Sequence, residues 1–174
     1  ATYTYVPYGQ VGAGQLLATQ TSQGMVSYTF GGLNSQQVPE TRSIPTGLAV
    51  SGGPTYTAEY NDEGQLTSQS VTGSVKQFYQ YNPDGRINRM SYQANVTTNG
   101  VTAPVEFYSD SRTYDQLGRV ADETTTGFNT ATDAQTSQSF NYDLLGRLTQ
   151  VDEQADSTCT TRSYTFDTRG NRTN

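Results

Sequence analysis

The stretch Tyr142-Asp143-Leu144-Leu145-Gly146-Arg147-Leu148 decides the fold that the sequence predicts. It recurs nearly unchanged as Tyr114-Asp115-Gln116-Leu117-Gly118-Arg119-Val120, and more loosely at 81–87, 60–66 and 166–172. Each copy keeps an aromatic residue with a glycine four positions later. Self-similarity of this kind is typical of proteins built from repeated supersecondary units, so the fold is best derived from a single unit.

The unit has the chemistry of a tight β-hairpin turn. Asp143 suits the first position of a type I turn, where its side-chain oxygen bonds the turn backbone, and Gly146 suits a position that needs a positive φ. We therefore expect a type I turn followed by a G1 bulge, with Asp143 paired to Arg147 across the ladder. The flanking Tyr142 and Leu148 then lie on the opposite face.

The same alignment assigns structural positions to the other copies and predicts the pair Asp115–Arg119. The predicted role of the repeat positions in every copy is structural, to form the hairpin. These positions are Tyr60 and Gly64; Tyr81, Gly85 and Arg86; Tyr114, Asp115, Gly118 and Arg119; Tyr142, Asp143, Gly146, Arg147 and Leu148; and Phe166, Asp167 and Gly170.

Side chains two residues before each anchor share its face of the strand. Tyr79, Phe140 and Tyr164 stand there and predict an aromatic ladder, which Ala58 and Arg112 fit less well. The expected sheet therefore has one ionic face and one aromatic and aliphatic face.

The first third of the chain fits the repeat poorly. Tyr5–Val11 keeps the aromatic, the glycine and the apolar end, and Tyr28–Leu33 is a candidate eroded copy. Residues 35–54 contain several prolines and Gly52-Gly53, which break the periodicity and predict a longer connection or a capping segment. We expect diverged N-terminal β repeats or a capping segment at 1–55 and a hairpin array at 56–174.

Composition supports an all-β chain. The apolar fraction is 32%, much of it from 13 Tyr and 6 Phe, which is too little aliphatic mass for a thick helical core. The formal charge of −6 and the scattered Lys and Arg argue against a nucleic-acid partner. No run is apolar enough to insert into a membrane, and the single Cys159 is interpreted as a strand residue.

At the quoted heptapeptides the sequence resembles the YD-repeat family, also called Rhs repeats, whose core unit is Tyr-Asp-x-x-Gly-Arg-Leu. The clear copies cover residues 60–172. The resemblance implies a curved, spiralling antiparallel sheet of hairpins. In bacterial polymorphic toxins and insecticidal toxin complexes that sheet is a hollow shell around a toxic polypeptide, and teneurins carry a related shell at animal cell surfaces.

The resemblance also implies partners and a location. The expected partners are the remainder of a longer parent chain and an enclosed toxin polypeptide, and the parent is expected to be secreted or at a cell surface. Because the repeat pattern reaches close to both ends, we expect the chain to be a fragment. An open sheet edge also predicts edge-to-edge self-association.

Catalysis is not expected, and neither a cofactor nor a metal is predicted. The chain has no histidine, which removes the commonest general base and histidine-ligated metal sites. The carboxylates weighed as a catalytic pair are Asp110, Asp115, Asp143 and Asp167, and all except Asp110 are already explained as turn residues. The acidic stretches at 61–63 and 152–153 lack the spacing of a calcium loop.

A second function remains open from the sequence. Exposed tyrosine rings can stack on sugars, so a carbohydrate-binding or adhesive surface module is the alternative to a scaffold. That alternative predicts clustered, solvent-facing rings. The favoured prediction is an all-β scaffold or encapsulating shell segment of a toxin-delivery protein.

Overall fold

The computed structural model describes residues 1–34, 36–71, 75–127, 135–155 and 157–173, and it contains β-strands and turns. The strands are β1 (Thr2–Tyr5), β2 (Leu16–Thr21), β3 (Gly24–Phe30), β4 (Pro45–Val50), β5 (Thr55–Tyr60), β6 (Leu66–Val71), β7 (Val75–Tyr81), β8 (Ile87–Thr98), β9 (Val101–Tyr114), β10 (Val120–Gly127), β11 (Gln135–Tyr142), β12 (Leu148–Ala155) and β13 (Thr158–Ser163).

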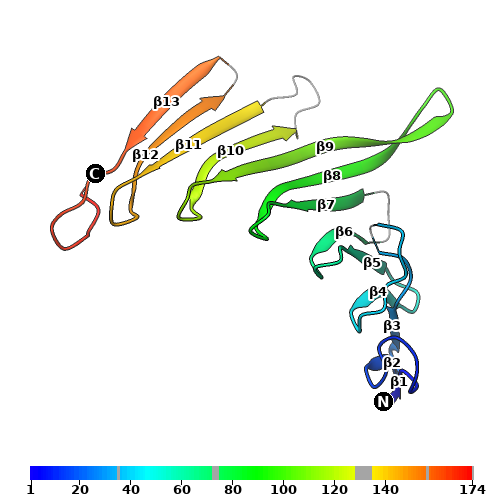
Figure 1. Ribbon diagram of the computed structural model, residues 1–174. Helices are drawn as coiled ribbons and strands as arrows, with labels where there is room; N and C mark the ends of the chain where they lie inside the picture. Colours follow the sequence, from blue (N-terminus) through cyan, green and yellow to red (C-terminus); the bar gives the residue numbers. More distant parts are fainter. Residues whose placement is uncertain (35, 72–74, 128–134, 156, 174) are drawn as a thin grey trace. The chain divides into compact units, whose positions relative to one another are not determined.

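The order of the strands in the sheet is their order in the chain, from β1 to β13 (Figure 1). Each strand is therefore hydrogen-bonded to its neighbours in sequence, and the pairing is antiparallel. The predicted all-β, antiparallel hairpin fold is confirmed. Tight turns make this order possible because antiparallel strands need only a few connecting residues, whereas parallel ones need a long crossover.

The chain forms two compact units. Unit 1 comprises Ala1–Tyr79 with Gln93–Pro104, and unit 2 comprises Gln80–Tyr92 with Val105–Asn174. Strands β1 to β6 belong to unit 1 and β10 to β13 to unit 2, while β7, β8 and β9 contribute to both. The boundary predicted between residues 55 and 56 falls at the first residue of β5, inside unit 1. That diverged repeats end and clear repeats begin there stays a prediction.

Very few apolar side chains are buried. Among the described residues, the buried hydrophobic ones are Val6, Ala58 and Val151, each about 5–6% exposed. Phe140 lies opposite Val151 across the β11–β12 ladder, so the aromatic position two before Tyr142 is on the same face of the sheet as this buried valine. A single sheet layer cannot hide a large apolar core, because its strands have no second layer to close against.

Residues 36–54, where the prolines predict a longer connection or a capping segment, contain a strand. Pro45–Val50 is strand β4, which pairs with β3 from Val26↔Val50 to Phe30↔Pro45 and with β5 from Gly47↔Thr57 to Ala49↔Thr55. Pro45 lacks a backbone N–H but stands at the first residue of its strand, where that donor is least needed. A proline therefore begins a strand here and does not interrupt one.

Candidate functional site

The hairpin turn between β9 and β10 shows the geometry of one repeat. The backbone N–H of Gly118 donates to the Asp115 carbonyl at 2.9 Å, and the N–H of Asp115 donates to the Arg119 carbonyl at 2.9 Å. Gly118 has a φ of +78°, and Tyr114 pairs with Val120 at the start of the ladder. A type I turn and a G1 bulge are thus present where the sequence predicts them.

The Asp side chain closes the same turn. Asp115 Oδ1 accepts the backbone N–H groups of Leu117 and Arg119, each at 2.9 Å, while Oδ2 accepts the Arg119 guanidinium at 2.6–2.7 Å. The bond from the Arg119 backbone is the main reason that the pKa of Asp115 lies below its ordinary value.

The other copies repeat this arrangement with small changes of residue. Asp143 binds Arg147 in the same way, and the pKa of Asp143 is lowered by the same backbone bond. Asn61 and Asn82 replace Asp and still accept the N–H of the fifth residue at 2.8–2.9 Å. At the last copy Asn171 takes the arginine position and donates to both carboxylate oxygens of Asp167.

The anchor tyrosine binds the preceding hairpin. The Tyr142 hydroxyl donates to the Val120 carbonyl at 2.9 Å, and the Tyr114 hydroxyl donates to the Ile87 carbonyl at 2.6 Å. Val120 and Ile87 hold the same position in their units, directly after the arginine. The hydroxyl, which sequence patterns alone leave unassigned, therefore joins one repeat to the next.

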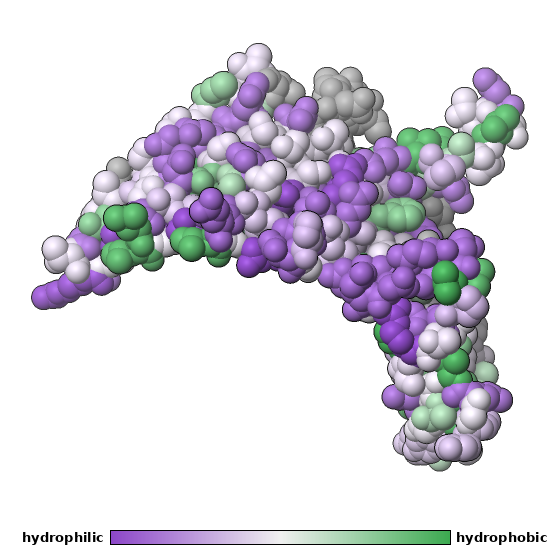
Figure 2. Space-filling model, viewed as in Figure 1, coloured by the Kyte–Doolittle hydropathy of each residue, from purple (hydrophilic) through white to green (hydrophobic). Residues whose placement is uncertain are grey.

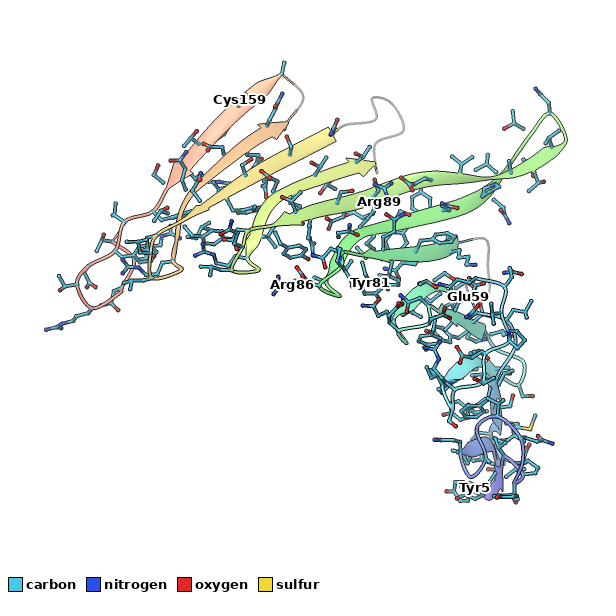
Figure 3. The ribbon with its side chains drawn as sticks, viewed as in Figure 1. Tyr5, Glu59, Tyr81, Arg86, Arg89 and Cys159 are labelled. Carbon is cyan, nitrogen blue, oxygen red and sulfur yellow. The ribbon has the colours of Figure 1, made fainter. Side chains whose placement is uncertain are left out.

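The repeat arginine makes the matching contact in the other direction. The Arg119 guanidinium carbon lies 4.4 Å from the Tyr142 ring centre, and that of Arg147 lies 4.5 Å from the Phe166 ring centre. Arg86, at the β7–β8 turn (Figure 3), lies 5.6 Å from the Tyr114 ring centre. A guanidinium over the face of an aromatic ring is attracted electrostatically by the quadrupole of that ring.

The repeat glycine has a second reason to lack a side chain. A Cβ placed on Gly118 would stand 2.1–2.2 Å from the Arg86 guanidinium, and one on Gly146 would stand 3.6 Å from Arg119. The arginine of one hairpin thus lies against both the aromatic ring and the glycine of the next. We call this arrangement, formed by Arg86, Arg119 and Arg147 with the copies that follow them, the inter-repeat contact.

A repeat that the sequence analysis missed lies at residues 33–39. Leu33 bridges Pro39, the N–H of Asn34 donates to the Val38 carbonyl at 2.8 Å, and Asn34 Oδ1 accepts the N–H of Val38 at 2.9 Å. Gln37 stands where glycine is expected and has a φ of +62°. The eroded copy is therefore this turn rather than Tyr28–Leu33, whose first three residues belong to β3.

The N-terminal copy ends at a later glycine than the sequence pattern predicts. Tyr5 pairs with Leu16, Val6 donates its N–H to Gln15 at 2.9 Å, and Gly14 has a φ of +80°. The unit is thus closed by Gly14-Gln15-Leu16, and not by Gly9-Gln10-Val11. The letters Gly-Gln-Leu also close the copy at 64–66, and that identity is the signal that would have located the insertion.

The predicted separation of an ionic and an aromatic face holds beside the turns and fails farther along the strands. Arg112 shares its face with Tyr114, and its Nη2 binds Asp110 at 2.6 Å and Glu123 at 2.9 Å. Burial is the main reason that the pKa of Asp110 is raised. On the same face Gln138 donates to Glu153, which also pairs with Arg162. A row of charged and amide groups therefore crosses β9 to β13.

The carboxylates weighed for catalysis do not converge on one cleft. Asp115, Asp143 and Asp167 each close a different turn, and Asp110 is held by Arg112. Within the described ranges, no three Cys, Asp or Glu side chains stand close enough together to hold a metal ion. The same ranges contain no helix long and apolar enough to span a membrane.

Exposed apolar side chains gather at turns of unit 2. Leu117 is 75% exposed and Leu145 is 78% exposed, and Leu144 is fully exposed. Figure 2 shows the corresponding hydrophobic spots at the β9–β10 and β11–β12 turns. The solvent-facing tyrosines Tyr3, Tyr5 and Tyr8 lie instead in and beside β1, whereas the rings of Tyr114 and Tyr142 are engaged between repeats.

Comparison with known proteins shows similarity of structure. No family model matches the sequence, and no curated protein matches it. The crystal structure of TcdB2-TccC3-TEV superposes with a TM-score of 0.59 at 17% identity over 91% of this chain and 8% of that chain. TcdB2-TccC3-Cdc42 gives 0.58 at 16% identity over 90% of this chain and 8% of that one.

A third structure, of the Photorhabdus luminescens Tc holotoxin pore, matches with a TM-score of 0.56 at 14% identity, over 90% of this chain and 9% of its own. This chain thus spans less than a tenth of the length of the chains that it matches. The identities are too low to show more than fold. The chain has the fold of a β-hairpin repeat segment found in toxin-complex chains.

Proposed function

We infer that this chain is a wall segment of a toxin-delivery protein, in which hairpin repeats form a shell around a toxin polypeptide. The observation that carries this proposal is the inter-repeat contact, which holds successive hairpins together at their turns without a thick core. The similarity in fold to TcdB2-TccC3 structures supports it.

Polarity supports a wall with water on both sides. The face of unit 2 that carries Tyr114 also carries the Arg112 and Gln138 row, and the other face carries Asp122 bonded to Thr113 and Ser139. A sheet that packed against a second protein layer would need one apolar face. A wall with water on both sides needs no apolar face.

The proposal assigns no catalytic step to this segment, because the carboxylates weighed for that role are engaged in turns or in the Arg112 cluster. The remainder of a parent chain is the proposed partner, and the exposed leucines at the β9–β10 and β11–β12 turns offer it apolar contacts. The parent is proposed to be secreted or displayed at a cell surface.

The test is protease protection in the parent protein. The polypeptide that follows the repeats should resist a protease that digests it readily when it is produced alone. Gly127→Ala should remove the protection, because a Cβ on Gly127 would stand 2.1 Å from the backbone oxygen of Phe107 and would open the β9–β10 ladder. Arg169→Met, at an exposed turn position, is the matched control. Equal digestion in all forms would refute an enclosing function.

A further inference from the structure

A pocket of about 380 Å³ lies on unit 1, at the ends of β6 and β7 that point away from the Tyr60 and Tyr81 turns. Its apolar lining comes from Val75, Phe78 and Pro104. Its polar lining includes Gln93 and Asn95. This volume is within the usual range for small-molecule sites, of roughly 300–1,000 Å³.

The charges beside the pocket are already balanced. Lys76 Nζ lies 3.1 Å from Glu59 Oε1 and 5.1 Å from the Phe78 ring centre. Burial alone would raise the pKa of Glu59, but the bonds from Ser68 and Lys76 outweigh it and lower that pKa, so Glu59 carries a negative charge near neutral pH. Figure 3 marks Glu59 on β5. A ligand in this pocket therefore meets no net charge, which favours a neutral molecule.

The amide groups are available to a ligand. Among the described residues, none is hydrogen-bonded to the side chains of Gln93 or Asn95, whereas the hydroxyl of Ser70 is already paired with Thr57 at 2.7 Å. Each amide offers two N–H donors and a carbonyl acceptor. The pocket thus combines a ring and proline surface with a rim that both donates and accepts.

We propose that this pocket binds a neutral sugar, of one or two rings. A pyranose has a face of C–H groups that suits Phe78 and Pro104, and a rim of hydroxyls that both donate and accept, which suits Gln93 and Asn95. Lys76 lies over one face of the Phe78 ring. This activity is independent of the shell function, because the pocket uses none of the residues of the inter-repeat contact.

The proposal is tested on the 174-residue chain labelled with ¹⁵N, titrated with neutral hexoses and N-acetylhexosamines and with their disaccharides. Saturable shifts of the Gln93 and Asn95 side-chain amides are expected with at least one probe. Gln93→Leu keeps an apolar side chain at this position and removes the amide with its hydrogen bonds, so it should weaken binding by about tenfold.

The matched control is Gln116→Leu, the same change at an exposed turn position in unit 2, which should leave the affinity unchanged. Phe78→Tyr should retain binding and Phe78→Ala should lose it, with the amide spectrum showing whether each variant is folded. The proposal is overturned if no probe gives saturable shifts. It is also overturned if Gln93→Leu binds as tightly as the parent chain.

Discussion

The guanidinium carbon of Arg119 lies 4.4 Å from the centre of the Tyr142 ring, while the same guanidinium binds Asp115 at 2.6 Å in its own turn. Arg119 therefore serves two consecutive hairpins at once. This relationship explains why the heptapeptide combines Tyr, Asp, Gly and Arg, since each of them is used either within a turn or between two turns.

A double-mutant cycle measures the contact between hairpins. Arg119→Met and Tyr142→Leu should each lower the free energy of unfolding, and their coupling should be about 0.5–2 kcal/mol, the usual range for a partly buried cation–π pair. Urea denaturation gives the four values. Arg169→Met, which removes an exposed arginine at the last turn, should have no measurable effect. Purely additive losses would show that the two side chains do not interact.

The two roles of the repeat glycine can be separated by comparing Gly118→Ala with Gly170→Ala. Both residues have positive φ, +78° and +85°, so each change should cost about 1 kcal/mol in backbone strain. Only Gly118 has a guanidinium in the space of the new Cβ. Its substitution should displace Arg86 from Tyr114 and cost about 0.5–1 kcal/mol more. In an Arg86→Ala background that excess should vanish, as thermal unfolding would show.

The concealed repeat at 33–39 offers a stabilising change. Gln37 has a φ of +62°, a conformation that favours glycine, so Gln37→Gly should raise the free energy of unfolding by about 0.5–1 kcal/mol. Gln36→Gly is the control. Gln36 does not have a positive φ, so glycine relieves no strain there and the change should lower stability. A loss of stability at Gln37 equal to that at Gln36 would contradict the assignment of the turn.

Glu40 should make stability depend on acid pH. The Arg42 side chain is the main reason that the pKa of Glu40 falls from 4.5 to about 2. Because the folded state lowers this pKa, the stabilising contribution is complete above pH 4.5 and is lost as the pH falls toward 2. Glu40→Gln should therefore show a smaller drop in Tm between pH 5 and pH 2 than the parent chain. An unchanged drop, measured by circular dichroism, would rule out this carboxylate as a source.

Asp110 should behave in the opposite sense. Burial raises its pKa, so its contribution to stability is complete below the ordinary value of 3.8 and is lost as the pH rises through the raised value. Asp110→Asn should then gain about 0.5–1 kcal/mol at pH 7, because a neutral isostere avoids burying the charge. Asp122, which pairs with Thr113 across the same β9–β10 ladder, has a lowered pKa from bonds to Ser139 and Thr113, and Asp122→Asn should lose stability instead.

The turns were predictable because their chemistry is local. Asp115 and Gly118 lie within four residues of each other, and the turn type follows from a side-chain acceptor and a glycine. The contact of Arg119 with Tyr142 was not predictable, because it depends on how far the intervening strands run before the next turn. Gln37 concealed a turn by tolerating a positive φ, and the insertion before Gly14 moved the closing glycine away from its usual spacing.

The candidate pocket was beyond sequence reasoning for a similar reason. Phe78 lies on β7, Asn95 on β8 and Pro104 on β9, and none of them belongs to the repeated heptapeptide. The tyrosines that suggested sugar binding are used differently, because Tyr114 and Tyr142 bind backbone carbonyls of the preceding hairpin. Placing them required the pairing of the strands, which the repeat spacing alone does not fix.

The identity of strand order and chain order has a consequence for biosynthesis. Every ladder joins neighbours in sequence, so a nascent chain can complete each hairpin and dock it on the previous one as soon as it leaves the ribosome or a translocation channel. The sheet can then form from its N-terminal strand onward, and no strand made late has to pair with one made early. Damage to one hairpin should accordingly stay confined to its two neighbours, as in a one-dimensional lattice.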